Sequence, residues 1–372
     1  MALRDPATAS ADPSISSATF FACYVFDVAD TIDLTRLSSV AGESAEPAPL
    51  LRTIPSPEAI QFAIPPLAAN LPPITVDSHT ASTRAKIYDY GVISIRFSFP
   101  YSGPWSGLEE LALELRKDDR LALLARGLLG QVLNDCSLAL DDPHEALVED
   151  YFVVAVEDFE PQLMAQTLLD DCRSSLVRLM TAEPHDLSPD QQAEAIRFHF
   201  SYFPDDLVVV QWDSAFIYDS EPDANVVLDL LEFANSQLVE FRTYDARLDA
   251  ELDSIYAGDF PPHRGALHRR ESERRAAQLR FLLVDIRELA DRSNNALKIT
   301  GDAYYARIYR AIASRLGLEV WQRQIEGKLD AVGDVYRYLV DQAQVARSEF
   351  LELIVIVLIA IEIVVGVLGL HH

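Results

Sequence analysis

The feature that most constrains this chain is an apolar stretch at residues 353–370, which reads LIVIVLIAIEIVVGVLGL. Its one ionisable side chain is that of Glu362. As a helix the stretch reaches about 27 Å, close to the roughly 30 Å hydrocarbon thickness of a bilayer. It therefore predicts a transmembrane helix over residues 351–370, with a buried helix in a large soluble core as the alternative.

The position of this stretch also predicts a location for the protein. Arg337 and Arg347 precede it, and positive side chains flanking a span favour the cytoplasmic side. Residues 1–18 lack the apolar core of a signal peptide and are predicted to be a disordered leader. The three cysteines include no CxxC pair, which indicates free thiols in a reducing compartment. We expect a single-pass cell inner-membrane protein with its bulk in the cytoplasm, or a mitochondrial inner-membrane protein if eukaryotic.

Composition limits the classes of partner. The chain has 372 residues, 49% of them hydrophobic, and a net charge of −27. That is enough apolar material for packed domains, and a field of that sign repels nucleic acid and anionic lipid unless a local basic patch intervenes. The eight histidines show no metal-ligand spacing. The sequence predicts no catalytic residue, no metal, no cofactor and no small-molecule substrate.

Residues 19–220 are expected to form an α+β domain. Apolar, β-branched and aromatic runs predict strands, and amphipathic segments between them predict helices. No glycine-rich phosphate loop follows any strand. The strand signals lie at residues 19–26, 85–99, 151–159 and 207–218.

Residues 221–350 are expected to form a domain of long, coiled-coil-like α-helices. No strand signal recurs there, and apolar residues keep a 4-3 spacing typical of a coiled-coil seam. The apolar seam can be buried against other helices of the same chain or against other subunits. We expect a homo-oligomer. The two clearest runs are Val227, Leu231, Ala234, Leu238, Phe241, Leu248, Leu252 and Ile255, and Ile325, Leu329, Val332, Tyr336, Leu339, Ala343, Ala346, Phe350 and Leu353.

Three segments of this half resemble a known family. They read DLLEFANSQLVEFRTYDARLD at residues 229–249, ALKITGDAYYARIY at 296–309 and LEVWQRQIEGKLDAVGDVYRYLVDQAQVARSEFLE at 318–352. With the apolar tail, they are similar to the YagE and required-for-meiotic-nuclear-division family, a family of unknown function. The resemblance implies a self-associating protein with a C-terminal membrane anchor, similar to family members that support translation in mitochondria. It implies no catalytic residues.

One helical face carries candidate structural ion pairs. Arg242, Asp245 and Asp249 fall at helical spacing, and Asp245 interrupts the apolar seam. A buried carboxylate needs a cation or several donors. We expect Arg307 or Arg310 to supply that cation, with a catalytic carboxylate pair as the less favoured alternative.

Two further polar features lie nearby. Asp302 follows Gly301 and is expected to cap a helix that restarts there. Residues 264–280 form a dense basic run in an acidic chain. The run predicts contact with RNA, a ribosome or anionic lipid, or else a solvated helix face. The candidate contact residues are Arg269, Arg270, Arg274 and Arg275.

Glu362 belongs to a stripe that predicts self-association of the expected membrane helix. Two glycines on the face of a carboxylate allow another helix to approach closely, and the acid can hydrogen-bond across the interface. The predicted oligomerisation residues are Glu352, Glu362, Gly366 and Gly369. A glutamate that merely faces lipid is the alternative.

The sequence thus favours a membrane-anchored homo-oligomeric scaffold that faces the cytoplasm and is not an enzyme. An oligomeric pore or ion pathway lined by Glu362 is the alternative from another class. An unrecognised enzyme in the α+β half is a third.

Overall fold

The computed structural model describes residues 12–40, 52–53, 64–256, 284, 302–334 and 355–359. The chain divides into two compact units. The first comprises Met1–Thr243 with Asp291–Trp321, and the second Tyr244–Ala290 with Gln322–His372.

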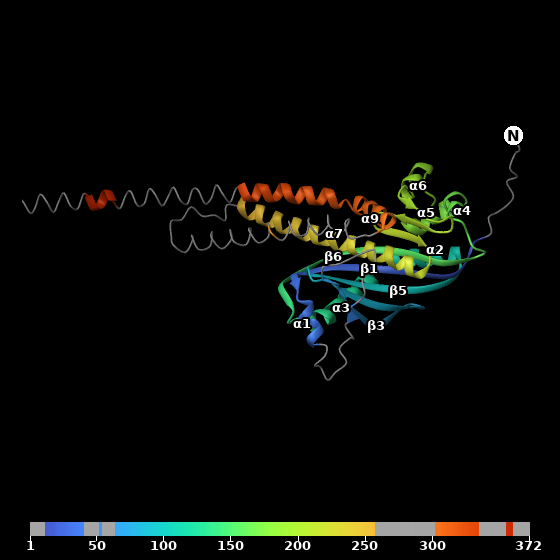
Figure 1. Cartoon of the computed structure of the whole chain (residues 1–372), viewed down its shortest axis with the longest axis horizontal. Helices are drawn as coiled ribbons and strands as arrows, with labels where there is room; N and C mark the ends of the chain where they lie inside the picture. Colours follow the sequence, from blue (N-terminus) through green and yellow to red (C-terminus); the bar gives the residue numbers. More distant parts are fainter. Residues whose placement is uncertain are drawn as a thin grey trace, which may run out of the picture. The chain divides into compact units, whose positions relative to one another are not determined.

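The first unit is built on a nine-stranded mixed sheet (Figure 1). Its strand order is β2-β3-β4-β5-β1-β6-β9-β8-β7, and every neighbouring pair is antiparallel except β6 and β9. The two longest strands, β1 and β6, lie side by side near its centre, because each pairs with the other over most of its length. The strands are β1 (Ser14–Ile32), β2 (Arg52–Thr53), β3 (Leu67–Val76), β4 (His79–Ile87), β5 (Val92–Pro104), β6 (Leu140–Glu160), β7 (His199–Phe200), β8 (Leu207–Val210) and β9 (Ser214–Tyr218).

One face of the sheet is covered by short helices. Successive strand side chains point to opposite faces, and one set from β1, including Phe20 and Tyr24, shares an apolar core with Trp105 of α2. Trp105 stacks on Phe159 with ring centroids 5.8 Å apart. The helices of this unit that precede the long one are α1 (Leu34–Val40), α2 (Trp105–Arg116), α3 (Asp119–Cys136), α4 (Ala165–Asp170), α5 (Arg173–Thr181) and α6 (Pro189–Ala195).

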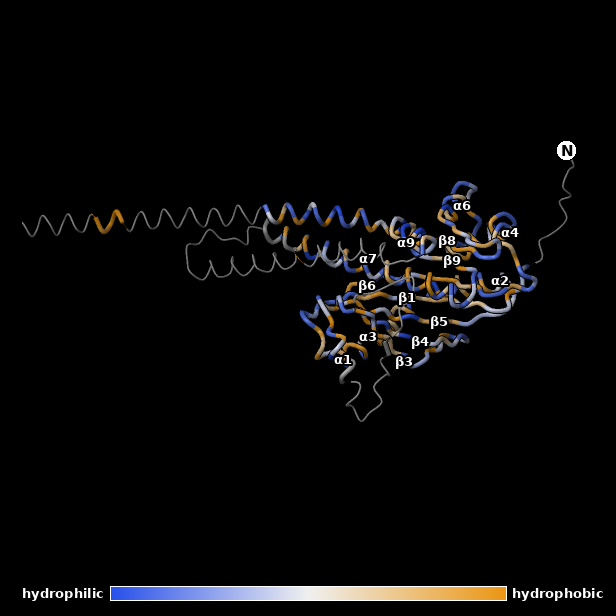
Figure 2. The backbone as a smooth tube through the Cα atoms, in the orientation of Figure 1, coloured by the Kyte–Doolittle hydropathy of each residue, from blue (hydrophilic) through white to orange (hydrophobic). Residues whose placement is uncertain are grey.

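The other face carries the long helix α7 (Glu221–Tyr256), which follows β9 directly. Every residue from 230 to 241 of α7 is buried, polar ones included. Figure 2 shows hydrophobic and hydrophilic segments alternating along α7. A helix buried all round belongs to the interior of a fold, and α7 is therefore a central element of this unit. It is accompanied by α9 (Ala303–Arg315), and a helical run at residues 318–334 follows.

The turn between β4 and β5 depends on Gly91. Its φ is +87°, and an added Cβ would lie 1.7 Å from the Ala29 carbonyl oxygen. Glycine is the residue that takes this left-handed conformation without a steric penalty. The tight turn lets the Gly91 carbonyl accept a hydrogen bond from Val28 N–H, at 3.0 Å, which ties the turn to β1.

The predicted transmembrane helix is wrong. Among the described residues, no helix combines the length and apolar character that a bilayer crossing requires. The predictions of a tail anchor and of single-pass inner-membrane localisation are corrected with it. Of the range 351–370, the structure describes residues 355–359, which are helical.

The predicted coiled-coil domain is also wrong, because the described helices form no long coiled-coil pair. The 4-3 apolar spacing of α7 arises from packing on a sheet, with burial on all sides over residues 230–241. Boundaries differ as well: β1 begins at Ser14, inside the expected leader, and the first unit takes in the first part of α7. The N-terminal half, expected as an α+β domain of unspecified topology, is a single large mixed sheet with helices.

Candidate functional site

A cluster of charged side chains lies between the sheet and α7. The sheet supplies Lys86 from β4 with Ser94 and Arg96 from β5. Lys86 and Ser94 are cross-strand partners, and Arg96 is the partner of Cys23 on β1. Alternation along the strands brings all four side chains to the face opposite the apolar core. We call Lys86, Ser94, Arg96, Asp229 and Glu232 the α7 cluster.

Helix α7 supplies the carboxylates, one helical turn apart. Lys86 Nζ lies 2.8 Å from Asp229 Oδ1 and 2.6 Å from Glu232 Oε2. Ser94 Oγ donates to Glu232 Oε1 at 2.5 Å, and Arg96 Nη1 lies 3.5 Å from Glu232 Oε2. Both oxygens of Glu232 are thus engaged by side chains of the sheet.

The α7 cluster holds its groups in fixed protonation states. Glu232 is 3% exposed and Lys86 5%. Burial favours the neutral acid, but Lys86 and Arg96 outweigh it and lower the pKa of Glu232 to about 2. Burial likewise opposes the charge on Lys86, yet Asp229 and Glu232 raise its pKa. General acid–base catalysis is most efficient when the pKa of the catalytic group lies near the working pH. The pKa shifts of Glu232 and Lys86 lead away from neutral pH.

Burial also acts on the thiol of the neighbouring Cys23. Burial, followed by the charge of Glu232, raises the pKa of its thiol to about 12. The thiolate is the nucleophilic form of cysteine, and it is not populated at neutral pH. The α7 cluster thus joins helix α7 to strands β4 and β5.

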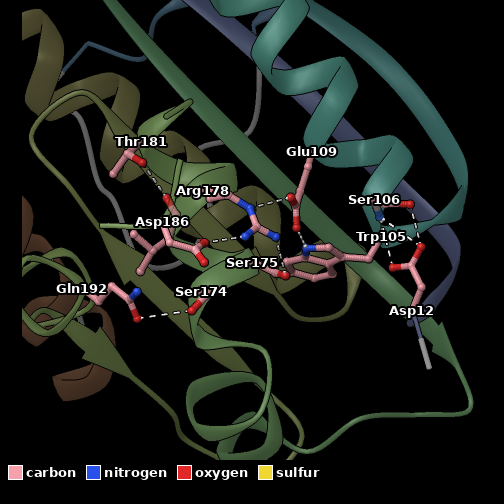
Figure 3. A network of polar contacts seen from close by, with 11 residues as sticks. Asp12, Trp105, Ser106, Glu109, Ser174, Ser175, Arg178, Thr181, Asp186 and Gln192 are labelled. Atoms are coloured by element: carbon pink, nitrogen blue, oxygen red, sulfur yellow. Dashed lines mark hydrogen bonds and ion pairs between the residues drawn. The ribbon is translucent and has the colours of Figure 1, made fainter. Parts of the chain in front are cut away.

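A second polar network joins α2 to α5 on the opposite face (Figure 3). Arg178 bridges Glu109 at 3.1 Å and Asp186 at 2.6 Å. Glu109 also accepts a hydrogen bond from Trp105 Nε1 at 2.8 Å. These contacts fix the orientation of two short helices, and each of the three charged groups has a partner within the network.

A third group, of acidic and aromatic side chains, lies around the start of α7 and α9; most of its members are exposed, and Asp219 and Tyr305 are half-buried. Tyr202 and Phe203 precede β8 and are 66% and 61% exposed. Asp206 holds their loop, because its carboxylate accepts from Tyr202 N–H at 2.7 Å and Phe203 N–H at 2.6 Å. We call Tyr202, Phe203, Tyr305, Asp205, Asp219 and Asp223 the acidic-aromatic surface.

The predicted ion-pair residues of α7 have partners, though not those expected. Arg242 pairs with Glu149 of β6. Asp245 and Asp249 each lie 2.6 Å from Lys328 Nζ, within the second unit. The cation beside Asp245 is therefore Lys328 and not Arg307 or Arg310.

Asp302 caps α9 by accepting a hydrogen bond from Tyr304 N–H at 2.6 Å. Arg307 lies over aromatic rings, with its guanidinium carbon 5.4 Å from the centroid of Phe200 and 5.6 Å from that of Tyr304. The remaining predicted site residues lie outside the described residues. They are Arg269, Arg270, Arg274, Arg275, Glu352, Glu362, Gly366 and Gly369.

Sequence reasoning missed the α7 cluster. The sequence does contain one indication of the cluster: Lys86 and Arg96 are basic residues inside runs otherwise rich in apolar residues. Buried charges of this kind require partners. The carboxylate that partners these residues lies more than 130 positions away along the chain, in a helix with an amphipathic pattern. The spacing of residues in the sequence therefore could not identify it.

These features define a mixed-sheet protein in which buried charges hold a long helix against one face of the sheet. The chain belongs to the family described as uncharacterized protein MJ0711, N-terminal domain, whose model matches residues 17–224. It is 20% identical over 200 residues to the uncharacterized protein MJ0711 of Methanocaldococcus jannaschii. The match covers 54% of this chain and 61% of that protein. No solved structure matches the chain. The expected membership of the YagE and required-for-meiotic-nuclear-division family is wrong.

Proposed function

We propose that this protein is a non-enzymatic scaffold that binds other protein chains, including copies of itself. The observation that carries the proposal is the engagement of both Glu232 oxygens by Lys86, Ser94 and Arg96. The charged groups of the α7 cluster are committed to holding α7 in place.

The thiols support the same proposal. All three cysteines are buried, and burial raises the pKa of Cys136, as of Cys23, to about 12. Burial also raises the pKa of Cys172. None of these groups presents a thiolate to a substrate at neutral pH.

The exterior provides a surface suited to binding. Aromatic side chains give large contact area and are enriched in the centres of protein interfaces. Tyr202 and Phe203 are mostly exposed, and their loop is held rigidly by Asp206. A rigid loop loses little conformational entropy when a partner binds.

Covalent cross-linking in cells tests the proposal. Three tagged proteins are compared: the wild type, a Lys86→Met, Arg96→Leu, Glu232→Leu variant that removes both cations and the most buried carboxylate of the α7 cluster, and a Tyr202→Ala, Phe203→Ala variant. The scaffold predicts that the first two capture the same partner chains. Absence of any captured chain with the wild type, or loss of all partners in a folded α7-cluster variant, contradicts it.

A further inference from the structure

We propose that the acidic-aromatic surface binds a basic segment of a partner protein, taking a Lys or Arg side chain against its rings and beside its carboxylates. The inference rests on the proposed scaffold function and names the chemistry of the partner. It follows from the arrangement of the rings, the state of the carboxylates and one buried hydroxyl.

The rings form a continuous row from the loop before β8 to α9. Tyr202 and Phe203 lie with centroids 4.8 Å apart, and Tyr202 and Tyr304 with centroids 5.3 Å apart. Tyr304 and Tyr305 follow at 5.5 Å. The Tyr305 hydroxyl donates to Asp223 Oδ1 at 2.9 Å, so the row ends on a carboxylate.

The carboxylates beside this row have no ion-pair partner in the part of the chain that the structure describes. Among the described residues, no ion pair involves Asp205, Asp219 or Asp223. Asp205 accepts a neutral hydrogen bond from Gln162 at 3.0 Å, and Asp219 accepts from the Ser220 N–H at 2.7 Å. Burial, together with the charges of Asp223, Asp206 and Asp205, raises the pKa of Asp219 to about 6. A bound cation relieves this repulsion.

A buried hydroxyl lies near the same carboxylates. Tyr304 is 9% exposed, and its hydroxyl has no hydrogen-bond partner among the described residues. Beyond burial, the charges of Asp206 and Asp219 act most strongly on it. A buried hydroxyl without a partner costs free energy, and a donor from a ligand ammonium or guanidinium removes that cost.

The surface already accommodates a cation of this class. The guanidinium of Arg307 lies over the Tyr304 ring at 5.6 Å, within the range of a cation–π contact. The rings of Tyr202 and Phe203 remain mostly exposed on the same row. A second cationic side chain, supplied in trans, fits beside them.

A peptide cation is favoured over a metal ion. Among the described residues, no three His, Cys, Asp or Glu side chains are grouped so that they could hold a metal. Aromatic rings are poor metal ligands but bind guanidinium and ammonium groups well. The net charge of −27 also steers basic partners toward the protein.

Fluorescence anisotropy with the full chain tests the inference. The probe is a labelled peptide of alternating Arg and Lys, at about 0.05 M salt, where charge interactions are weakly screened. We expect the Asp219→Asn, Asp223→Asn variant and the Tyr202→Ala variant each to bind about five- to tenfold more weakly than wild type. The matched control is Glu114→Gln with Asp135→Asn, which removes two exposed charges from α2 and α3 and should leave affinity within about twofold.

Wild-type affinity should also rise as pH increases from about 5 to about 7, because a cation binds the ionised form of Asp219. The groups that act on this carboxyl are Asp205, Asp206 and Asp223 with the Ser220 N–H. The Asp219→Asn, Asp223→Asn variant should lose this dependence.

Three results overturn the inference. They are absence of binding by the wild type, an equal loss of affinity in the control, and binding of arginine amide as tight as that of the peptide, which indicates a site for a small cation. A negative result in this peptide-binding experiment can be distinguished from failure of the proposed scaffold function. Partners that still cross-link to wild type and are lost with Tyr202→Ala, Phe203→Ala leave the scaffold standing and refute only the basic partner.

Discussion

The ammonium group of Lys86 lies 2.6 Å from Glu232 Oε2 and joins strand β4 to helix α7 across 146 positions of sequence. This pair, with Arg96 and Ser94, adds a buried polar attachment to the apolar residues by which α7 packs on the sheet. A buried ion pair contributes little net stability. Removing one partner, however, leaves the other charge buried without a counter-ion, which is strongly destabilising.

We expect Glu232→Ala to lower the free energy of unfolding by about 3–5 kcal/mol, because it leaves Lys86 and Arg96 buried without their carboxylate. Urea denaturation followed by circular dichroism measures this. Glu114→Gln, on the exposed side of α2, should stay within about 0.5 kcal/mol of wild type. If Glu232→Ala lowered the free energy of unfolding as little as the control variant does, water or other groups would have to solvate Lys86 and Arg96 in place of the carboxylate.

The same carboxylate predicts an acid transition. Its pKa is lowered in the folded protein to about 2 from its ordinary value of 4.5. The stability that it contributes is therefore fully present above about pH 4.5 and is lost as pH falls toward 2. Stability measured at successive pH values should fall less steeply in Glu232→Gln than in wild type over this window. Parallel curves would argue against a lowered pKa.

The three thiols should be unreactive in the folded protein. Cys23, Cys136 and Cys172 are all buried, and burial raises the pKa of each. With a disulfide reagent at about pH 8, we expect fast reaction only after denaturation. Rapid labelling of one thiol in the native state would identify a reactive cysteine and weigh against the scaffold.

Gly91→Ala should destabilise the protein by more than about 2 kcal/mol, because alanine is strained at a left-handed φ and its Cβ meets the Ala29 carbonyl oxygen at 1.7 Å. Gly127 is the control, since it lies on exposed α3 surface with open space where a Cβ would stand. Gly127→Ala should be neutral or stabilising by up to about 1 kcal/mol. Thermal denaturation of both variants decides, and an unaffected Gly91→Ala would mean that the turn relaxes.

Sequence patterns predicted the central strands but not their environment. The apolar runs at residues 19–26 and 151–159 lie in β1 and β6. The pattern of α7 was misread, because its apolar 4-3 spacing fits a coiled coil as well as a helix packed on a sheet. Glu232 and Gln237 are polar and nonetheless buried. Only the tertiary structure supplies the partners that permit this.

The acidic-aromatic surface was equally hidden. Tyr202 and Tyr304 stand about a hundred positions apart, and their rings lie 5.3 Å from each other. Sequence reasoning placed Asp302 at the start of a helix, and the structure shows its carboxylate accepting from Tyr304 N–H. The approach of that helix to the loop before β8 depends on long-range packing, for which no local spacing gives a signal.

The most direct test of the account is the stability of the variant in which Lys86→Met, Arg96→Leu and Glu232→Leu are combined. If the α7 cluster serves only to attach α7, apolar side chains of similar volume can replace its three most buried charges, while Asp229 stays in contact with water. The free energy of unfolding should then match or exceed that of wild type, as found for other buried ion pairs. A loss of about 3–5 kcal/mol in the combined variant, equal to that of Glu232→Ala, would contradict the account.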